Sequence, residues 1–200
     1  MADDSSTEKL RLFIAIPIPE SVRDEIIHVQ REMQPLAPRG TVRWTKPDQF
    51  HLTLRFLGDV PVAGLEKLKE SVNAVCRSAQ PLQLSAKGVG FFPNPHSPRV
   101  VWVGIDDKEG LLVDLQKRIE PAVRPFTAES GAENFSGHAT LGRVKKLKPP
   151  DIRKLAAHAQ TVKDRTLGEW TAHEIEIIRS ELSPVGARHT TLAAFRLGAV

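Results

Sequence analysis

HLTLRF at residues 51–56 and HATLGR at residues 138–143 are the two stretches that decide the fold of this chain. In each of them a histidine is followed two positions later by a threonine and then by a leucine. Polar and apolar residues alternate with a period of two, which is typical of a β-strand with one buried face. The histidine and the threonine of each stretch therefore point to one side of a strand, and the intervening residues point to the core.

The two stretches occupy matching places in an internal repeat. The first half reads as strand 12–16, helix 20–33, strand 50–56, helix 62–76 and strand 82–89. The second half reads as strand 100–105, helix 111–123, strand 138–144, helix 151–159 and strand 175–178. The first strands begin 88 residues apart, the motif histidines lie 87 residues apart, and the prolines before the second helices lie 88 residues apart. A nearly constant offset across three independent features indicates a duplication.

The repeat predicts a single duplicated α+β domain over residues 1–200, with half-repeats at about 10–92 and 98–180. Each half alone would leave an open sheet edge and an uncovered face, so the halves are expected to pack together. We expect two pseudo-symmetric lobes, each a mostly antiparallel sheet with outer helices, flanking a central groove. The apolar run 12–16 predicts a central strand, and a closing strand at about 189–197 is expected to cross back to the first lobe.

Composition is that of an ordinary globular protein, with 40% apolar and 26% charged residues. The net charge of +4 favours an anionic substrate without predicting a nucleic-acid-coating tail. The one cysteine, Cys76, falls at an apolar helical position and is expected in the core, which fits a reducing compartment. Residues 1–10 show no secretory signal, and no apolar run is long enough to span a bilayer, so a cytoplasmic protein is expected.

The paired motifs carry a specific chemistry. His51 with Thr53, and His138 with Thr140, each present an imidazole beside a hydroxyl. Two opposed imidazoles suit phosphodiester cleavage, because one neutral ring removes a proton from the attacking oxygen while a second, protonated ring gives one to the leaving oxygen. The threonine hydroxyls can donate to the non-bridging phosphate oxygens. Either histidine can play either part in a pseudo-symmetric site.

The motifs HLTLRFLG and HATLGR resemble those of the 2H phosphoesterase superfamily, specifically the RNA 2′,3′-cyclic phosphodiesterases once described as 2′-5′ RNA ligases. The likeness extends over nearly the whole chain, through RLFIAIPIP, VRWTKPDQF, RVVWVGI and IRSELSPVGARHTTLAAFRL. It implies the 2H phosphoesterase fold and hydrolysis of a 2′,3′-cyclic phosphate on RNA to a 2′-phosphomonoester. It also implies that His51 is the proton donor to the departing 3′-oxygen and His138 the proton acceptor that activates water.

Two other functions stay open at this point. One is a related enzyme that opens small cyclic nucleotides or joins RNA ends reversibly through a 2′-5′ bond. The other belongs to a different class, a nucleotide- or RNA-binding module that has kept the groove and lost the chemistry. The intact motifs argue against the second.

Residues outside the four motif positions are weaker candidates. By strand parity Arg55 faces the groove, whereas Arg143 points away unless Gly142 bends its strand, and both are candidates for holding phosphate. Trp44 is a candidate for stacking on a base or for packing between the lobes. His189 also begins a His-x-Thr pattern, but it has no counterpart at the repeat offset and is expected to stand outside the site.

No cofactor and no obligate protein partner are predicted, and no metal is expected. The two motifs supply nitrogen ligands without a neighbouring carboxylate or thiolate to complete a metal site. We therefore expect a chelator such as EDTA to leave hydrolysis unchanged in an assay on a cyclic-phosphate-ended oligonucleotide. Complete loss of activity, restored by added metal, would contradict acid–base catalysis by the histidines alone.

Overall fold

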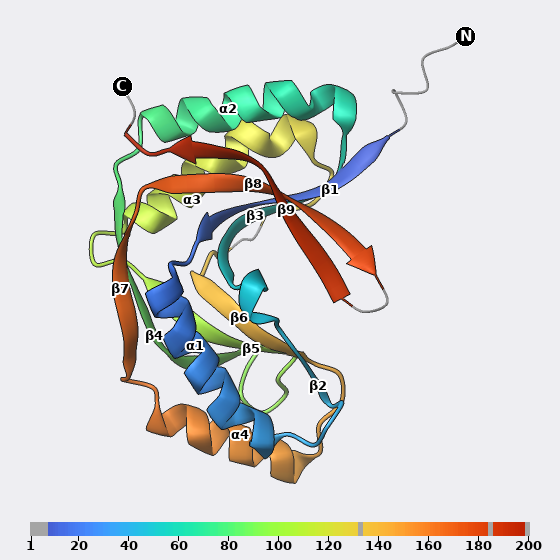
Figure 1. The fold of residues 1–200 in the computed structure, drawn as a ribbon, viewed down its shortest axis with the longest axis vertical. Coiled ribbons are helices and arrows are strands. Elements are labelled where there is room, and N and C mark those ends of the chain that lie inside the picture. Colours follow the sequence, from blue (N-terminus) through green and yellow to red (C-terminus); the bar gives the residue numbers. More distant parts are fainter. Residues whose placement is uncertain (1–7, 132–133, 184–185, 199–200) are drawn as a thin grey trace.

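Two antiparallel sheets form the centre of the computed structural model, which describes residues 8–131, 134–183 and 186–198 (Figure 1). The strands are β1 (Lys9–Pro17), β2 (Val42–Trp44), β3 (His51–Pro61), β4 (Leu82–Phe92), β5 (Val100–Asp106), β6 (His138–Val144), β7 (Thr166–Ala172), β8 (Glu174–Ser183) and β9 (Gly186–Arg196). The helices of more than one turn are α1 (Glu20–Met33), α2 (Leu65–Arg77), α3 (Leu111–Val123) and α4 (Pro149–Thr161). The expected α+β class is confirmed.

The four-stranded sheet has the order β3-β1-β8-β9, and the five-stranded sheet has the order β2-β6-β5-β4-β7. Helices α2 and α3 pack together on the first sheet, while α1 and α4 lie against the second (Figure 1). β1 is an inner strand, as its apolar run predicts, and all five residues of 12–16 are buried. The short β2 and the strand β7 are absent from the sequence-based prediction, because three residues carry no periodicity and TLGEWTA mixes small, charged and aromatic residues.

Each sheet is completed by a strand from the opposite half of the sequence. β4 ends the first half, yet it pairs with β5, and β8 ends the second half, yet it pairs with β1. The triplet β3-β1-β8 thus corresponds to β6-β5-β4, and the return to the first lobe is made by β8, with β9 alongside it. A lobe is therefore not one half of the chain. The assignment of half-repeats within one duplicated domain stays a prediction, which this correspondence supports.

A β-bulge follows the His-x-Thr pattern in both motif strands. Opposite β1, the pairing of β3 passes from Thr53 to Arg55 and leaves Leu54 unpaired. Opposite β5, the pairing of β6 passes from Thr140 to Gly142 and leaves Leu141 unpaired. An extra residue in one strand moves the side chains that follow it to the opposite face of the sheet, up to the next irregularity, which in β3 comes at Leu57. The two bulges are 87 residues apart and therefore occupy equivalent places in the repeat.

The bulge in β6 is held by a buried glutamine. Gln30 of α1 is 3% exposed, and its Nε2 donates to the backbone oxygens of Leu141, at 2.9 Å, and Thr45, at 2.8 Å. The Leu141 oxygen also accepts from the Thr45 backbone nitrogen at 2.9 Å. A side chain at position 142 would meet Val42 Cγ1 at 2.8 Å, so glycine there permits β2 to lie against the bulge.

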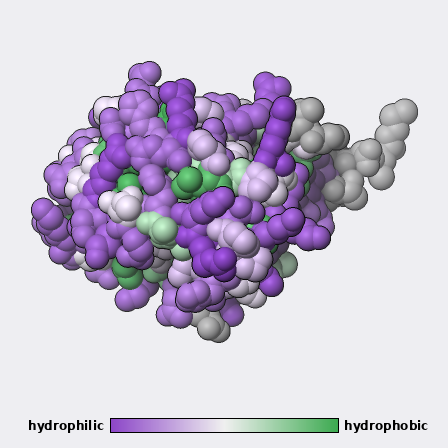
Figure 2. Space-filling view, turned by 90° about the horizontal axis from the view of Figure 1, so that it is seen from below, coloured by the Kyte–Doolittle hydropathy of each residue, from purple (hydrophilic) through white to green (hydrophobic). Residues whose placement is uncertain are grey.

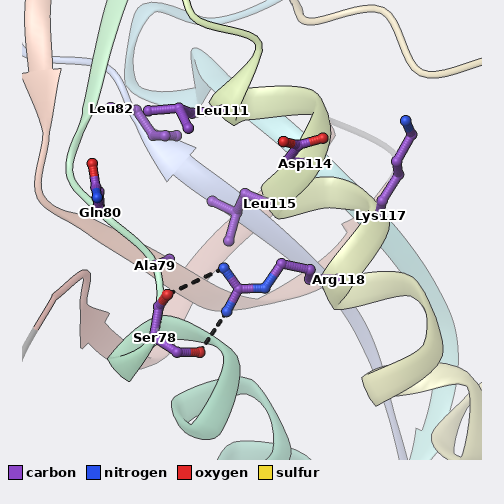
Figure 3. Close-up of a pocket in the computed structure, with 9 residues that line it drawn as sticks. All are labelled: Ser78, Ala79, Gln80, Leu82, Leu111, Asp114, Leu115, Lys117 and Arg118. Atoms are coloured by element: carbon purple, nitrogen blue, oxygen red, sulfur yellow. Dashed lines mark hydrogen bonds between the residues drawn. The ribbon is translucent and has the colours of Figure 1, made fainter.

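The helices α2 and α3 are joined at the end of α2. Arg118 of α3 donates to the backbone oxygens of Val75 and Ser78, where a cation is favoured by the helix dipole. Arg118 and Ser78 border a hollow of about 360 Å³, and Figure 3 shows the Arg118 side chain pointing to Ser78. Cys76 is fully buried, as expected. Burial raises the pKa of its thiol to about 12, although the charge of Arg118 acts to lower it.

The outer surface is mostly polar on the face seen from below in Figure 1, where hydrophobic residues show only in small spots (Figure 2). Among the described helices, none combines the length and the apolar character needed to cross a membrane. Residues 1–7, on which the expected absence of a secretory signal rests, lie outside the described part of the chain.

Replacing Gln30 with leucine tests the support of the bulge. The variant removes the two hydrogen bonds that Gln30 donates to backbone oxygens and the one it accepts from Gln34, and it leaves the partly buried Thr45 oxygen without that donor, so we expect a loss of roughly 2 kcal/mol in the free energy of unfolding. Urea denaturation followed by circular dichroism measures it. Gln83→Leu is the matched control, because Gln83 bonds an exposed threonine; equal stability of the two variants would contradict the role of Gln30.

Candidate active site

A cavity of about 550 Å³ opens between the two sheets. His51 and Thr53 of β3 and Thr140 of β6 line it, so the structure brings the two motifs to one place. Of the four motif residues, His138 is the one that does not line this cavity, although its charge acts on His51. The cavity is also lined by Phe56 and Gly58 of β3, by Arg143 of β6, and from other parts of the chain by Arg11, Leu12, Phe13, Arg43, Trp44, Thr45, Gln49, Glu129, Ser180, Leu182, Ala187 and His189.

The two histidines are anchored in the same way. His51 Nδ1 lies 2.7 Å from the backbone oxygen of Gln49, and His138 Nδ1 lies 2.8 Å from that of Ser136. A carbonyl oxygen only accepts hydrogen bonds, so each Nδ1 carries the proton and donates it. This arrangement assigns the neutral tautomer and leaves each Nε2 available to take or give a proton. Each motif strand thus begins with a histidine whose ring is held by the backbone oxygen of the residue two positions earlier.

Aromatic rings pack against both imidazoles. The Phe13 ring lies 4.7 Å from the His51 ring, and the Phe92 ring lies 4.9 Å from the His138 ring, measured between centroids. Phe13 is 2% exposed and comes from the inner strand β1, while Phe92 comes from the end of β4. Neither residue has a signal in the sequence pattern, because their positions depend on strand pairing and not on a motif.

Both imidazoles favour the neutral form in the free protein. Burial lowers the pKa of His51 to about 4, with the charges of His189 and His138 acting in the same direction and the Gln49 oxygen opposing them. Burial also lowers the pKa of His138, where the Ser136 oxygen opposes the shift and the Arg143 charge adds to it. An anion between the rings would favour the protonated form of each.

The prediction that Arg55 faces the groove is wrong. Its side chain is 5% exposed and points to the outer side of β3, where its Nε lies 2.8 Å from Glu120 Oε2. Its guanidinium also donates to the backbone oxygens of Phe56, Glu129 and Ser130. The physical reason is the bulge at Leu54, which inverts the strand parity on which the prediction depends. Arg55 therefore ties β3 to α3 and the loop that follows it.

The same inversion brings Arg143 into the cavity, which simple strand parity would not predict. The bulge at Leu141 turns the Arg143 side chain toward the site, where its charge acts on His138. Phe56 is the counterpart of Arg143 in the first half, and it too lines the cavity, with 53% of its surface exposed. In the sequence, Gly142 directly after Leu141 is a feature that could have indicated the bulge in β6, whereas Arg55 and Phe56 after Leu54 indicate none in β3.

His189 also lines the cavity, so the expectation that it stands outside the site is wrong. Its ring centroid is 5.4 Å from that of His51 and 5.0 Å from that of Phe13. The repeat offset excluded it from the sequence-based site because β9 has no counterpart in the first half. Trp44 lines the cavity as well, and its role in stacking stays a prediction.

The charge of the cavity is mainly positive. Arg11, Arg43 and Arg143 line it from three strands, against the carboxylate of Glu129. Among residues 8–131, 134–183 and 186–198, no three His, Cys, Asp or Glu side chains gather as a metal site. Thr53 and Thr140 supply hydroxyl donors beside the imidazoles. The arrangement can hold a phosphate group between two proton-transfer groups.

Fold and site together are those of a phosphoesterase with one histidine motif on a strand of each sheet. A family model described as LigT-like phosphoesterase matches residues 16–102. The RNA 2′,3′-cyclic phosphodiesterase of Methanothermobacter thermautotrophicus is 32% identical over 94% of this chain and 100% of its own length. That of Archaeoglobus fulgidus is 31% identical over 93% of this chain and 99% of its own. The chain belongs to the LigT-like phosphoesterase family, as the motifs predict.

Solved structures show the same fold. The crystal structure of TT0787 from Thermus thermophilus superposes with a TM-score of 0.77 at 28% identity and covers 94% of this chain and 98% of that one. The Escherichia coli LigT structure in complex with 3′-AMP gives a TM-score of 0.74 at 24% identity, over 95% and 99% of the two chains. The likeness to the second structure concerns the fold alone.

The two arginines give a paired test of the bulges. Arg55→Met leaves Glu120 and three backbone oxygens without their donor, so we expect a loss of about 3 kcal/mol in unfolding free energy. Arg143→Met removes an exposed cation at the cavity, so we expect unchanged stability and weaker binding of inorganic phosphate. Denaturation curves and calorimetric titration measure both variants. Weaker phosphate binding by a fully stable Arg55→Met protein would contradict the assignment.

Proposed function

We propose that this protein hydrolyses 2′,3′-cyclic phosphate ends of RNA to 2′-phosphomonoesters without a metal, using His51 and His138 as an acid–base pair. The observation that carries the proposal is the matched anchoring of the two rings. Each donates its Nδ1 proton to the backbone oxygen two residues earlier and keeps its Nε2 free, with a threonine of the same strand at the cavity. The family relatives named as RNA 2′,3′-cyclic phosphodiesterases supply the substrate class.

In the proposed reaction, His138 Nε2 takes a proton from a water molecule as the water oxygen attacks phosphorus. The bond from phosphorus to the 3′-oxygen breaks, and His51 gives a proton to that oxygen. The hydroxyls of Thr53 and Thr140 donate to the non-bridging oxygens, and Arg143 balances the charge that they gain. The product is a 2′-phosphomonoester with a free 3′-hydroxyl, and the two histidines exchange protonation states until solvent restores them.

The donor role of His51 requires a proton that the free protein holds poorly, because its pKa is lowered to about 4 chiefly by burial. A cyclic phosphate carries a negative charge, and an opposite charge within a few ångströms raises the pKa of an imidazole. Substrate binding and protonation of His51 are therefore coupled in this mechanism. The assignment of donor and acceptor follows the family likeness, since the geometry treats the two rings alike.

RNA is the proposed partner because three arginines line the cavity and the chain has a net charge of +4. We place this activity in the cytoplasm, where the buried thiol of Cys76 stays reduced. We propose no obligate protein partner.

The test is to identify the product from an oligonucleotide that ends in a 2′,3′-cyclic phosphate. Phosphorus NMR or chromatography against standards separates the two monophosphates, and the 2′-monophosphate is expected. Mononucleotide cyclic phosphates and 2′-5′-linked dinucleotides complete the substrate set. A 3′-monophosphate product would contradict the proposed leaving group. Rapid turnover of mononucleotides with none of oligonucleotides would displace RNA as the substrate.

His51→Ala and His138→Ala are each expected to lower kcat by about 10²–10⁴-fold, the usual contribution of a general acid or base. Inorganic phosphate should still bind, since the threonines and Arg143 remain. Stopped assays give kcat, and thermal melting shows whether the fold is kept. His96→Ala is the control, because His96 is exposed in the loop between β4 and β5. Normal hydrolysis by either active-site variant would remove that residue from the mechanism.

A further inference from the structure

The His51 ring is held on three sides. Its Nδ1 donates to Gln49, the Phe13 ring lies tilted at 31° to it, and the His189 ring meets it edge to face at 69°. His138 donates to Ser136 in the same way and has the rings of Phe92 and Trp102 beside it, with centroids 4.9 and 6.3 Å away, whereas among the described residues no imidazole is stacked on it. His189 therefore distinguishes the surroundings of His51 from those of His138.

The backbone position of His189 is fixed by strand pairing. It lies opposite Ser180 in the β8–β9 ladder, and β8 in turn pairs with β1, the strand that carries Phe13. The side chain of Gln49 donates to the backbone oxygen of Ala187, so β9 is also tied to the turn whose carbonyl anchors His51. The ring of His189 is thus placed by two connections that converge on His51.

His189 is also a second titratable group beside His51. Its positive charge opposes protonation of His51, and burial lowers the pKa of His189 itself while Asp48 acts in the opposite direction. The other charged or titratable groups that line the cavity or act on the histidines are Arg11 on β1, Arg43 on β2, Glu129 after α3, and His138 and Arg143 on β6. Arginines outnumber carboxylates among these groups, so without a bound anion the protonated form of a histidine is disfavoured there.

We propose that His189 is a positioning residue of this site, which holds the His51 ring against Phe13 and, when it is itself protonated, opposes protonation of His51. The inference rests on the proposed donor role of His51. It assigns His189 no proton transfer to substrate.

Two substitutions separate packing from charge. His189→Asn removes both the ring and its charge, so we expect the pKa of His51 to rise and kcat to fall about tenfold, as reacting groups lose their alignment. His189→Phe keeps a ring against Phe13 and His51 without a charge, so it should restore most of kcat. His96→Asn is the matched control for removal of a distant histidine and should change neither quantity.

The pKa of His51 is measured by NMR titration of the labelled imidazole rings in the free protein, with His51→Gln used to assign the resonance. This readout needs no substrate, so it can fail while the proposed function holds, and loss of activity in His51→Ala tests that function separately. An unchanged pKa of His51 in His189→Asn would overturn the charge role. A variant that raises KM and leaves kcat unchanged would make His189 a substrate contact and overturn the positioning role.

Discussion

The exchange of strands between the two halves is the constraint on which the rest of the structure depends. β8 pairs with β1 and β4 pairs with β5, so each sheet contains strands from both halves of the chain. β1 in turn pairs with the motif strand β3, and β5 pairs with the motif strand β6. The two motif strands belong to different sheets and contact each other, and the cavity opens between the sheets. The placement of the two motifs therefore depends on pairing within each sheet and on packing between the sheets, and reacting groups need such defined placement.

The bulges turn this symmetric framework into an asymmetric site. Before Leu54 and Leu141 the two motif strands present the same groups, a histidine and a threonine. After the bulges they present different ones, since Phe56 lines one side of the cavity and Arg143 the other. Arg55, turned outward by its bulge, binds Glu120 and three backbone oxygens and so anchors β3. Equivalent places on the two motif strands thus bring an aromatic ring and a cation to the cavity, while the two histidines of the proposed acid–base pair keep matching positions.

The sequence predicts the elements and the motif positions well, because both depend on local periodicity. The strands around His51 and His138 and the inner position of β1 follow from patterns of two and from a continuous apolar run. Side-chain facing after a bulge does not follow, because a bulge is decided by pairing with a distant strand. The prediction for Arg55 is wrong because strand alternation does not continue past the bulge at Leu54. The prediction for His189 is wrong because the repeat offset does not apply to β9, which has no counterpart in the first half of the sequence.

The electrostatics of the cavity connect these features to proton transfer. Burial lowers the pKa of both His51 and His138; the charges of His189 and His138 lower that of His51 further, and the charge of Arg143 lowers that of His138 further. The backbone oxygens of Gln49 and Ser136 act in the opposite direction, and each also fixes a tautomer. A site built in this way is neutral at its imidazoles when empty. A negatively charged ligand between the rings would reverse that balance, so in the proposed reaction the phosphate to be cleaved also supplies the condition under which His51 acts as an acid.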